Sequence, residues 1–234
     1  MLTRIAMWSG PRNISTAMMR SFGARSDSVV VDEPLYAHYL QATGLEHPLR
    51  DEVIASQPQR WEDAVAQLLG PLPDAQVQYQ KHMTHHLLPQ IGTDWMVGLQ
   101  HAYLIRDPAR VIASYARVRT EPDLADLGFE QQARIFRRFN GPVVDADDLL
   151  RDPPGVLKRL CAALDIEFQP SMLTWPAGPR DTDGVWAPQW YASVESSTGF
   201  AGAPTTPVSV PDRLQPLLAQ ARPYYDELAA HRLT

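Results

Sequence analysis

The chain has 234 residues, of which 44% are apolar and 21% charged, and its formal net charge is −6. This length and composition predict one folded domain with a sizeable core and exclude a disordered chain. The acidic balance argues against a surface for nucleic acid or anionic membrane, so an anion site must be a local group of arginines.

The chain has one cysteine, Cys161, and no apolar run long enough to span a membrane. Because Cys161 lies in an amphipathic segment, we expect it in the core rather than in a disulfide or a nucleophilic site. The sequence enters a predicted strand directly, without a secretory signal. We therefore expect a cytoplasmic protein that binds neither nucleic acid nor membrane.

The first strong signal is the segment that follows the first predicted strand. An apolar run from Leu2 to Trp8 is typical of a buried strand, a Gly-Pro turn follows, and a helical pattern starts at Ser15. Free backbone N–H groups at a helix start, with the guanidinium of Arg12 nearby, favour bound anions. A nucleotide-triphosphate loop is not indicated, because no Lys precedes Ser15. The sequence predicts a phosphate- or sulfate-binding loop, and the alternative is an ordinary strand-to-helix turn with a solvated Arg12. The predicted loop is made of Ser9, Gly10, Pro11, Arg12, Asn13, Ile14, Ser15 and Thr16.

Two carboxylates follow the second predicted strand, Ser28–Val31. In open α/β sheets, ligands bind outside the carboxyl ends of the strands, which is where Asp32 and Glu33 are expected. Asp32 has an alternative role as the N-cap of the segment Leu35–Gln41. Glu33 has no such structural role and is a candidate general base.

A predicted strand over residues 75–80, with one apolar face, leads into Lys81 and His82. We interpret these two residues as catalytic or donor-binding groups, with simple surface placement as the alternative. The spacing of His82 and His86 would suit two zinc ligands on a helix, but no third ligand suggests itself. No metal is therefore expected.

The second strong signal covers residues 100–116. A strand is predicted over His101–Ile105, with Arg106 at its end, Asp107 as a helix N-cap and Pro108 as the first helical residue. Arg106 would hold a second phosphate together with Ser114 if the hydroxyl faces the same side. The alternative is an exposed arginine and a solvent-facing serine.

The rest of the chain alternates short strands with helices, which predicts one α/β domain over residues 1–234 with a largely parallel sheet. The proline-bearing segments 44–75 and 165–205 are expected to form caps that shape an acceptor pocket. Further elements are predicted over Arg60–Leu69, Glu130–Asn140, Val143–Asp145, Pro153–Leu164 and Pro211–His231.

These motifs resemble those of sulfotransferases that use 3′-phosphoadenosine-5′-phosphosulfate (PAPS) as donor. The loop 11–16, PRNIST, keeps the family's proline, cation and paired hydroxyls but has Asn13-Ile14 in place of the usual Ser-Gly. The family's second motif is an arginine at a strand end with a serine eight residues later, which Arg106 and Ser114 match.

The resemblance implies a three-layer α/β sandwich of the P-loop nucleotide-binding type. It implies that the first loop binds the 5′-phosphosulfate of PAPS, and that Arg106 and Ser114 bind the 3′-phosphate. The usual C-terminal Gly-rich loop with a lysine is missing. We expect the segment Ser197, Thr198, Gly199 and Phe200 to take its place.

The expected activity is transfer of a sulfuryl group from PAPS to a hydroxyl or amine of a small-molecule acceptor, with 3′,5′-adenosine bisphosphate as product and no metal. Arg12, with Lys81 as a further candidate, would neutralise the leaving oxygen, and Glu33 is favoured over His82 as the base. One alternative is a P-loop kinase or NTPase in which Asp32-Glu33 forms a Walker-B-like magnesium site. Another is a non-catalytic nucleotide-binding protein. A homodimer is a further possibility that the sequence does not decide.

Overall fold

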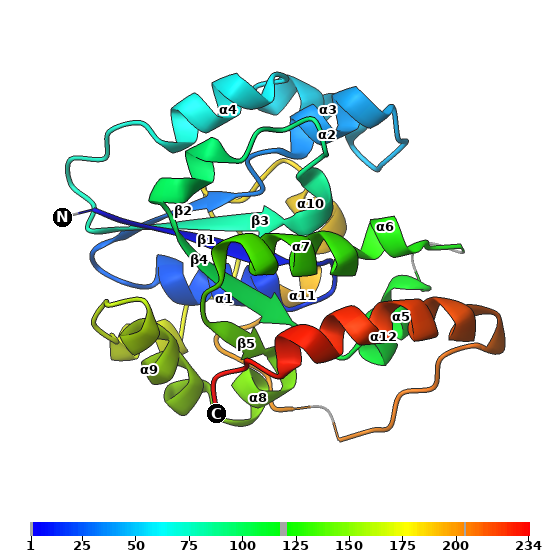
Figure 1. Cartoon of the computed structure of the whole chain (residues 1–234). Coiled ribbons are helices and arrows are strands. Elements are labelled where there is room, and N and C mark those ends of the chain that lie inside the picture. The colour runs from blue at the N-terminus through cyan, green and yellow to red at the C-terminus, as the bar shows by residue number, and fades with distance from the viewer. Residues whose placement is uncertain (1, 118–120, 204) are drawn as a thin grey trace.

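The computed structural model describes residues 2–117, 121–203 and 205–234. Its centre is a five-stranded sheet of parallel pairs in the order β2-β3-β1-β4-β5, with helices on both faces (Figure 1). The predicted α/β sandwich with a parallel sheet is therefore confirmed. The strands are β1 (Thr3–Ser9), β2 (Ser28–Asp32), β3 (Val77–Met83), β4 (Gln100–Ile105) and β5 (Val143–Asp145).

The apolar run at the start of the chain forms the central strand β1. Successive side chains of a strand point to opposite faces, so β1 contributes to two cores. Ile5 and Met7 pack with α1, α2 and α9 on one face, whereas Ala6 and Trp8 pack with α7 and α12 on the other. This alternation makes the fold three layers thick. The helices are α1 (Ser15–Gly23), α2 (Tyr36–Thr43), α3 (Arg50–Ser56), α4 (Trp61–Leu68), α5 (Pro108–Tyr115), α6 (Leu124–Leu127), α7 (Phe129–Phe139), α8 (Ala146–Arg151), α9 (Pro153–Ala163), α10 (Ala187–Trp190), α11 (Ala192–Glu195) and α12 (Gln215–Ala229).

The strand β3 is longer and more buried than its sequence pattern indicates. It continues through Met83, and every one of its residues is buried, including those of the polar face. That face is satisfied internally, because Gln80 Nε2 donates to Gln78 Oε1 and Gln78 Nε2 donates to the Leu68 carbonyl, both at 2.9 Å. A buried amide that keeps its hydrogen bonds can replace an apolar side chain at this position.

The helix that follows β4 begins as its sequence predicts. Asp107 accepts a hydrogen bond from the Ala109 N–H at 2.8 Å, and Pro108 is the first residue of α5. Arg222 of α12 also pairs with Asp107 at 2.8 Å, so the C-terminal helix packs over this turn. The predicted helix 211–231 is divided into a short 3-10 turn (Asp212–Leu214) and α12, which contains Pro223.

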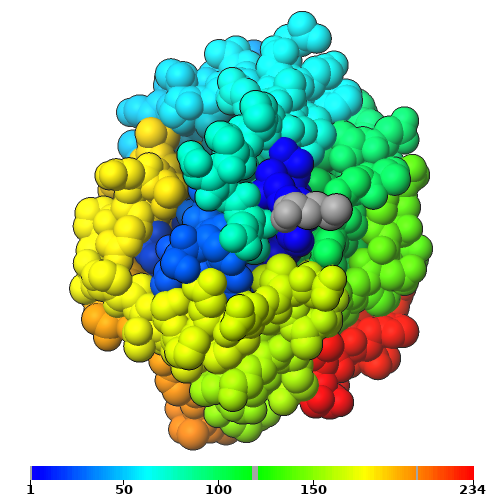
Figure 2. Space-filling view, turned by 90° about the vertical axis from the view of Figure 1, so that its left-hand side faces the viewer, coloured from blue at the N-terminus to red at the C-terminus, as the bar shows by residue number. Residues whose placement is uncertain are grey.

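Both predicted cap segments contain short helices. Segment 44–75 holds α3 and α4, which lie beyond the β2 edge in Figure 1. Segment 165–205 begins against the loop between α1 and β2, and Figure 2 shows the yellow part of the chain beside the blue part on this face. Arg25 Nη1 of that loop donates to the Glu167 carbonyl at 2.6 Å. Cys161 is buried in the core, as predicted. Within the described ranges, no helix has the length and apolar character needed to cross a bilayer.

Candidate functional site

The loop 9–16 connects β1 to α1 at the carboxyl edge of the sheet. Arg12 and Ile14 have positive φ angles of 62° and 56°, which residues other than glycine seldom adopt. Asn13 is buried between them and donates from Nδ2 to the Leu104 carbonyl of β4 at 3.0 Å. No side chain caps the start of α1. The loop is therefore held in a fixed turn that leaves the first N–H groups of the helix available to a ligand.

Gly10 allows a second segment to close over this loop. A Cβ at Gly10 would collide with the carbonyl oxygen of Leu127, the last residue of α6. The same junction is fixed from the other side, because Thr84 Oγ1 donates to the Gly128 carbonyl at 2.9 Å. The α6–α7 junction thus packs directly on the backbone of the loop.

The two motifs of the sequence meet in space. Arg12 Nε donates to Ser114 Oγ at 2.9 Å, and Arg106 Nη1 donates to the Arg12 carbonyl at 2.8 Å. Arg117 Nη2 also donates to Ser114 Oγ, at 3.2 Å. Ser114 is buried rather than solvent-facing. The loop and the first helix after β4 therefore share one polar cluster.

This cluster is strongly positive. Burial lowers the pKa of Arg12, and the neighbouring charge of Arg117 lowers it further. Burial also lowers the pKa of Arg106, where Arg110 and Arg12 act in the same direction and Asp147 opposes them. Asp147 is engaged mainly by Arg110, whose Nε lies 2.9 Å from Oδ2. Crowded cations of this kind favour a bound anion.

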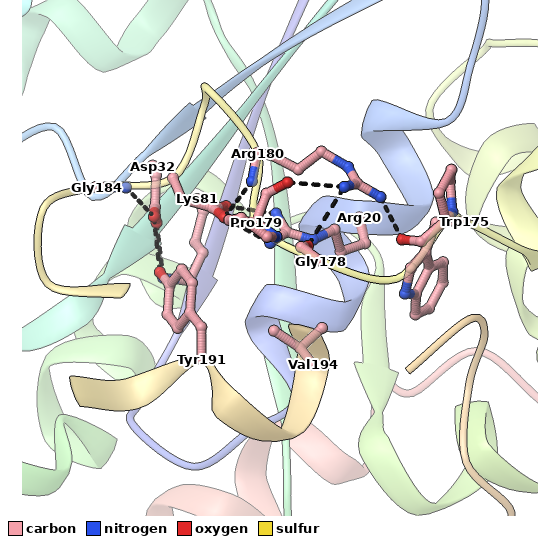
Figure 3. Close-up of polar contacts among 12 residues, drawn as sticks. Arg20, Asp32, Lys81, Trp175, Gly178, Pro179, Arg180, Gly184, Tyr191 and Val194 are labelled. Carbon is pink, nitrogen blue, oxygen red and sulfur yellow. Dashed lines mark hydrogen bonds and ion pairs between the residues drawn. The ribbon is translucent and has the colours of Figure 1, made fainter. Parts of the chain in front are cut away.

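A second cluster surrounds Lys81, whose side chain is 1% exposed. Its Nζ lies 2.8 Å from Asp32 Oδ1, donates to Tyr191 Oη at 2.8 Å, and contacts Glu33 Oε1 (Figure 3 shows Lys81, Asp32 and Tyr191). An ammonium group has three donors, and these three oxygens use all of them. Burial acts to lower the pKa of Lys81, but the two carboxylates raise it well above its usual value. Lys81 is therefore charged.

Asp32 does not cap α2, which corrects the alternative considered from the sequence. Helix α2 follows Leu35 and has no side-chain cap. Besides its contact with Lys81, Asp32 accepts at Oδ2 from the Tyr191 hydroxyl at 2.7 Å and from the Gly184 N–H at 3.1 Å. These bonds tie the segment 184–191 to the end of β2, in the arrangement that Figure 3 shows.

Only one of the two carboxylate oxygens of Glu33 is in contact with Lys81. Lys81 contacts Oε1, whereas Oε2 faces His86 Nδ1 at 3.9 Å, which is too long for a hydrogen bond. Burial raises the pKa of Glu33, and Lys81 opposes this effect. Burial also moves the pKa of His86 well below its usual value, so this imidazole is neutral. Glu33 has a positive φ of 42°, a strained conformation of the kind that concentrates at functional sites.

His82 lies on the opposite face of β3 from Lys81. Its ring stacks on Trp8 at 4.4 Å between centroids, and its Nε2 lies 3.1 Å from Gln80 Oε1. Burial, together with His101, lowers the pKa of His82 to about 3. The structure therefore brings Lys81 and Glu33 together and places His82 in the other core.

The segment 197–200 packs on Trp175. The indole Nε1 of Trp175 donates to Ser197 Oγ at 3.1 Å, and its backbone N–H donates to the Thr198 carbonyl at 3.1 Å. Gly199 pairs with Thr174 in an isolated bridge, and Phe200 contacts the Trp175 ring edge-on. Among the hydrogen bonds of the described residues, none joins this segment to the loop 9–16.

Two residues of these clusters, Arg117 and Tyr191, escaped the sequence reasoning, and His86 was considered only as a zinc ligand. Arg117 lies three positions after the candidate Ser114, a local signal that could have found it. The contacts of Tyr191 and of His86 carried no such signal, because their partners come from distant parts of the chain.

The chain matches the family model described as "Sulfotransferase domain" over residues 3–232 and belongs to that family. Two curated relatives from Arabidopsis thaliana, branched-chain-amino-acid aminotransferase-like proteins 1 and 2, are 40% and 35% identical over 232 residues, or 97% of this chain. The chain spans 42% and 41% of their lengths.

Solved sulfotransferases share the fold. The sulfotransferase from Alicyclobacillus acidocaldarius is 14% identical, with a TM-score of 0.59 over 100% of this chain and 98% of that one. The sulfotransferase domain from the curacin biosynthetic pathway is 17% identical, with a TM-score of 0.53 over 95% of this chain and 98% of that one. Identities this low establish a common architecture.

Proposed function

We propose that this chain transfers a sulfuryl group from PAPS to a hydroxyl or amine of a small-molecule acceptor. Membership of the sulfotransferase family supports sulfuryl transfer in general. The choice of donor rests on one observation, the convergence of Arg12, Arg106 and Ser114 beside the start of α1.

The unsatisfied groups of this cluster fit a ligand with two anionic ends. Arg106 Nε is buried and has no hydrogen-bond partner among the described residues, although Asp147 Oδ1 lies 4.0 Å away. The start of α1 offers backbone N–H groups at a second point, next to Arg12. A donor with phosphates on both its 5′ and 3′ positions would use both groups, with the 3′-phosphate at Arg106 and Ser114.

When bound, PAPS supplies the sulfuryl group and a phosphate oxygen as leaving group. Sulfuryl transfer then requires positioning and stabilisation of developing negative charge, as phosphoryl transfer does. Arg12 belongs to the loop where that charge develops. The three donors of Lys81 are already used, so we assign Lys81 to the positioning of Glu33 rather than to the leaving oxygen.

Glu33 Oε2 is the oxygen that takes the proton of the acceptor. It is free because Lys81 contacts the other oxygen, and burial raises the pKa of Glu33 toward the range in which a carboxylate is an effective base. His86 is neutral and does not compete as a cation for the carboxylate. After transfer, the proton resides on Glu33 until it is released to solvent.

The contacts of Asp32 and Glu33 argue against a kinase or NTPase. A Walker-B-like site would use these carboxylate oxygens for magnesium, but the ammonium of Lys81 lies between them. A non-catalytic nucleotide-binding protein would not need a strained, buried carboxylate with one open oxygen.

A transfer assay tests the proposal. The protein is incubated with PAPS carrying radiolabelled sulfur and a panel of phenols, alcohols and amines, alongside the Glu33→Gln variant. We expect label in an organic product with the wild type and a much lower rate with the variant. Label found only in inorganic sulfate with both proteins, or transfer of phosphate from ATP and magnesium instead, would contradict the proposal.

A further inference from the structure

Arg117 lies two residues beyond α5, outside both sequence motifs, and points its guanidinium at Ser114. Its Nη2 donates to Ser114 Oγ at 3.2 Å, while Arg12 Nε donates to the same oxygen at 2.9 Å. Arg117 itself is exposed. One hydroxyl is thus contacted by two cations that come from different elements of the fold.

The hydroxyl oxygen of Ser114 accepts two hydrogen bonds, but its proton has no acceptor among the described residues. A hydroxyl oxygen has two lone pairs and one proton. Arg12 and Arg117 use the lone pairs, and no described residue accepts the proton. The hydroxyl must therefore direct its proton away from both arginines, toward the open side of the cluster. A negatively charged oxygen placed there would accept this proton and face both guanidinium groups.

The charges of the cluster lead to the same conclusion. Other arginines nearby have carboxylate partners: Arg110 pairs with Asp147 at 2.9 Å and Arg222 with Asp107 at 2.8 Å. Within the described part of the chain, no carboxylate lies within ion-pair distance of Arg12 or Arg117. The two cations share only a neutral hydroxyl, which does not offset their repulsion.

We propose that Arg117 is a second cationic ligand of the donor's 3′-phosphate, beside Arg106, and selects donors that carry this group, while Arg12 contacts the shared Ser114 from the side of the loop. The inference rests on the proposed function, because it assigns the 3′-phosphate to Ser114. It adds a residue that neither motif contains. Ser114 on the last turn of α5 and Arg117 just beyond that helix contact each other, so they face the phosphate from one side, and Arg106 faces it from the end of β4.

Calorimetric titration of the purified protein tests this assignment. The ligands are 3′,5′-adenosine bisphosphate and adenosine 5′-monophosphate, which differ only in the 3′-phosphate. We expect Arg117→Gln to raise the dissociation constant of the bisphosphate about tenfold, as loss of a partly exposed charge-assisted hydrogen bond should. Its effect on the monophosphate should stay within about twofold, and Arg117→Lys should fall between wild type and Arg117→Gln.

Arg134→Gln is the matched control, because it removes the same charge from an exposed position on α7. It should leave both affinities unchanged. Equal weakening of the two ligands by Arg117→Gln, or no change in either, would overturn the role of Arg117 while leaving the proposed donor intact. A wild-type protein that binds the bisphosphate no better than the monophosphate would overturn both proposals.

Discussion

The buried ammonium of Lys81 should be a major determinant of stability. The side chains of Lys81 and Asp32 are 1% and 2% exposed, and that of Glu33 is 10% exposed. The Lys81→Met variant keeps an unbranched apolar chain of similar length but leaves two buried carboxylates without their cation. Removing one partner of a buried ion pair costs about 3–5 kcal/mol. We expect the free energy of unfolding to fall by this amount near neutral pH.

The loss should depend on pH with a definite sign. Burial raises the pKa of Glu33 and Lys81 opposes this effect, so without Lys81 the folded variant binds a proton at Glu33 more readily than the unfolded chain does. Lowering the pH from about 7 to about 5 should therefore reduce the deficit of the variant relative to the wild type.

Urea denaturation followed by tryptophan fluorescence at both pH values measures this effect. Lys158→Met is the matched control, because Lys158 is the only other lysine of the chain and is exposed on α9, with Nζ 5.6 Å from the centre of the Phe168 ring. Its replacement should cost no more than about 1 kcal/mol. If Lys81→Met costs no more than Lys158→Met, or if its deficit does not shrink at the lower pH, the reasoning on this cluster is wrong.

Three further predictions follow from the site and its surroundings. Glu33→Gln should lower the transfer rate by about 10²–10⁴-fold and leave the affinity for adenosine bisphosphate nearly unchanged, and equal turnover would rule out Glu33 as the base. Gly10→Ala, which places a methyl group against the Leu127 carbonyl, should lower the unfolding free energy by about 1–3 kcal/mol, whereas Gly202→Ala, in open space, should not. His82 has a pKa of about 3 when folded, against a usual 6.5, so the unfolded chain binds its proton first as pH falls. The contribution of His82 to the free energy of unfolding should therefore fall by about 2 kcal/mol as the pH is lowered from about 7 to about 5. Denaturation at a series of pH values should show that His82→Phe removes this dependence.

The parts of the molecule that the sequence predicts well depend on local signals. The apolar run of β1, the turn after it and the helical pattern from Ser15 lie within a few residues of one another. The same is true of Asp107 and Pro108, whose cap geometry is confirmed at the start of α5. Arg106 and Ser114 were recognisable because a strand end and one helix fix their spacing.

The remaining features depend on contacts between distant residues. Lys81 takes its partners from positions 48, 49 and 110 residues away, and no periodicity reveals such a meeting. The local sequence around Asp32 allows it to cap a helix. Its carboxylate oxygens instead bind Lys81, Gly184 and Tyr191, which lie far away in the sequence. The alternation of β3 indicates one apolar face, but the glutamines of its other face are buried as well and bond to each other, to the Leu68 carbonyl and to His82.

The central claim is that the site recognises a donor with a 3′-phosphate, and thermal stabilisation of the wild-type protein tests it most directly. The ligands are adenosine bisphosphate, adenosine monophosphate, and ATP with magnesium. A ligand at about a hundred times its dissociation constant adds about 2.7 kcal/mol, which should raise Tm by about 5–10 °C in a domain of this size. We predict this shift with the bisphosphate and a much smaller one with the monophosphate. Stabilisation by ATP with magnesium alone would contradict the account.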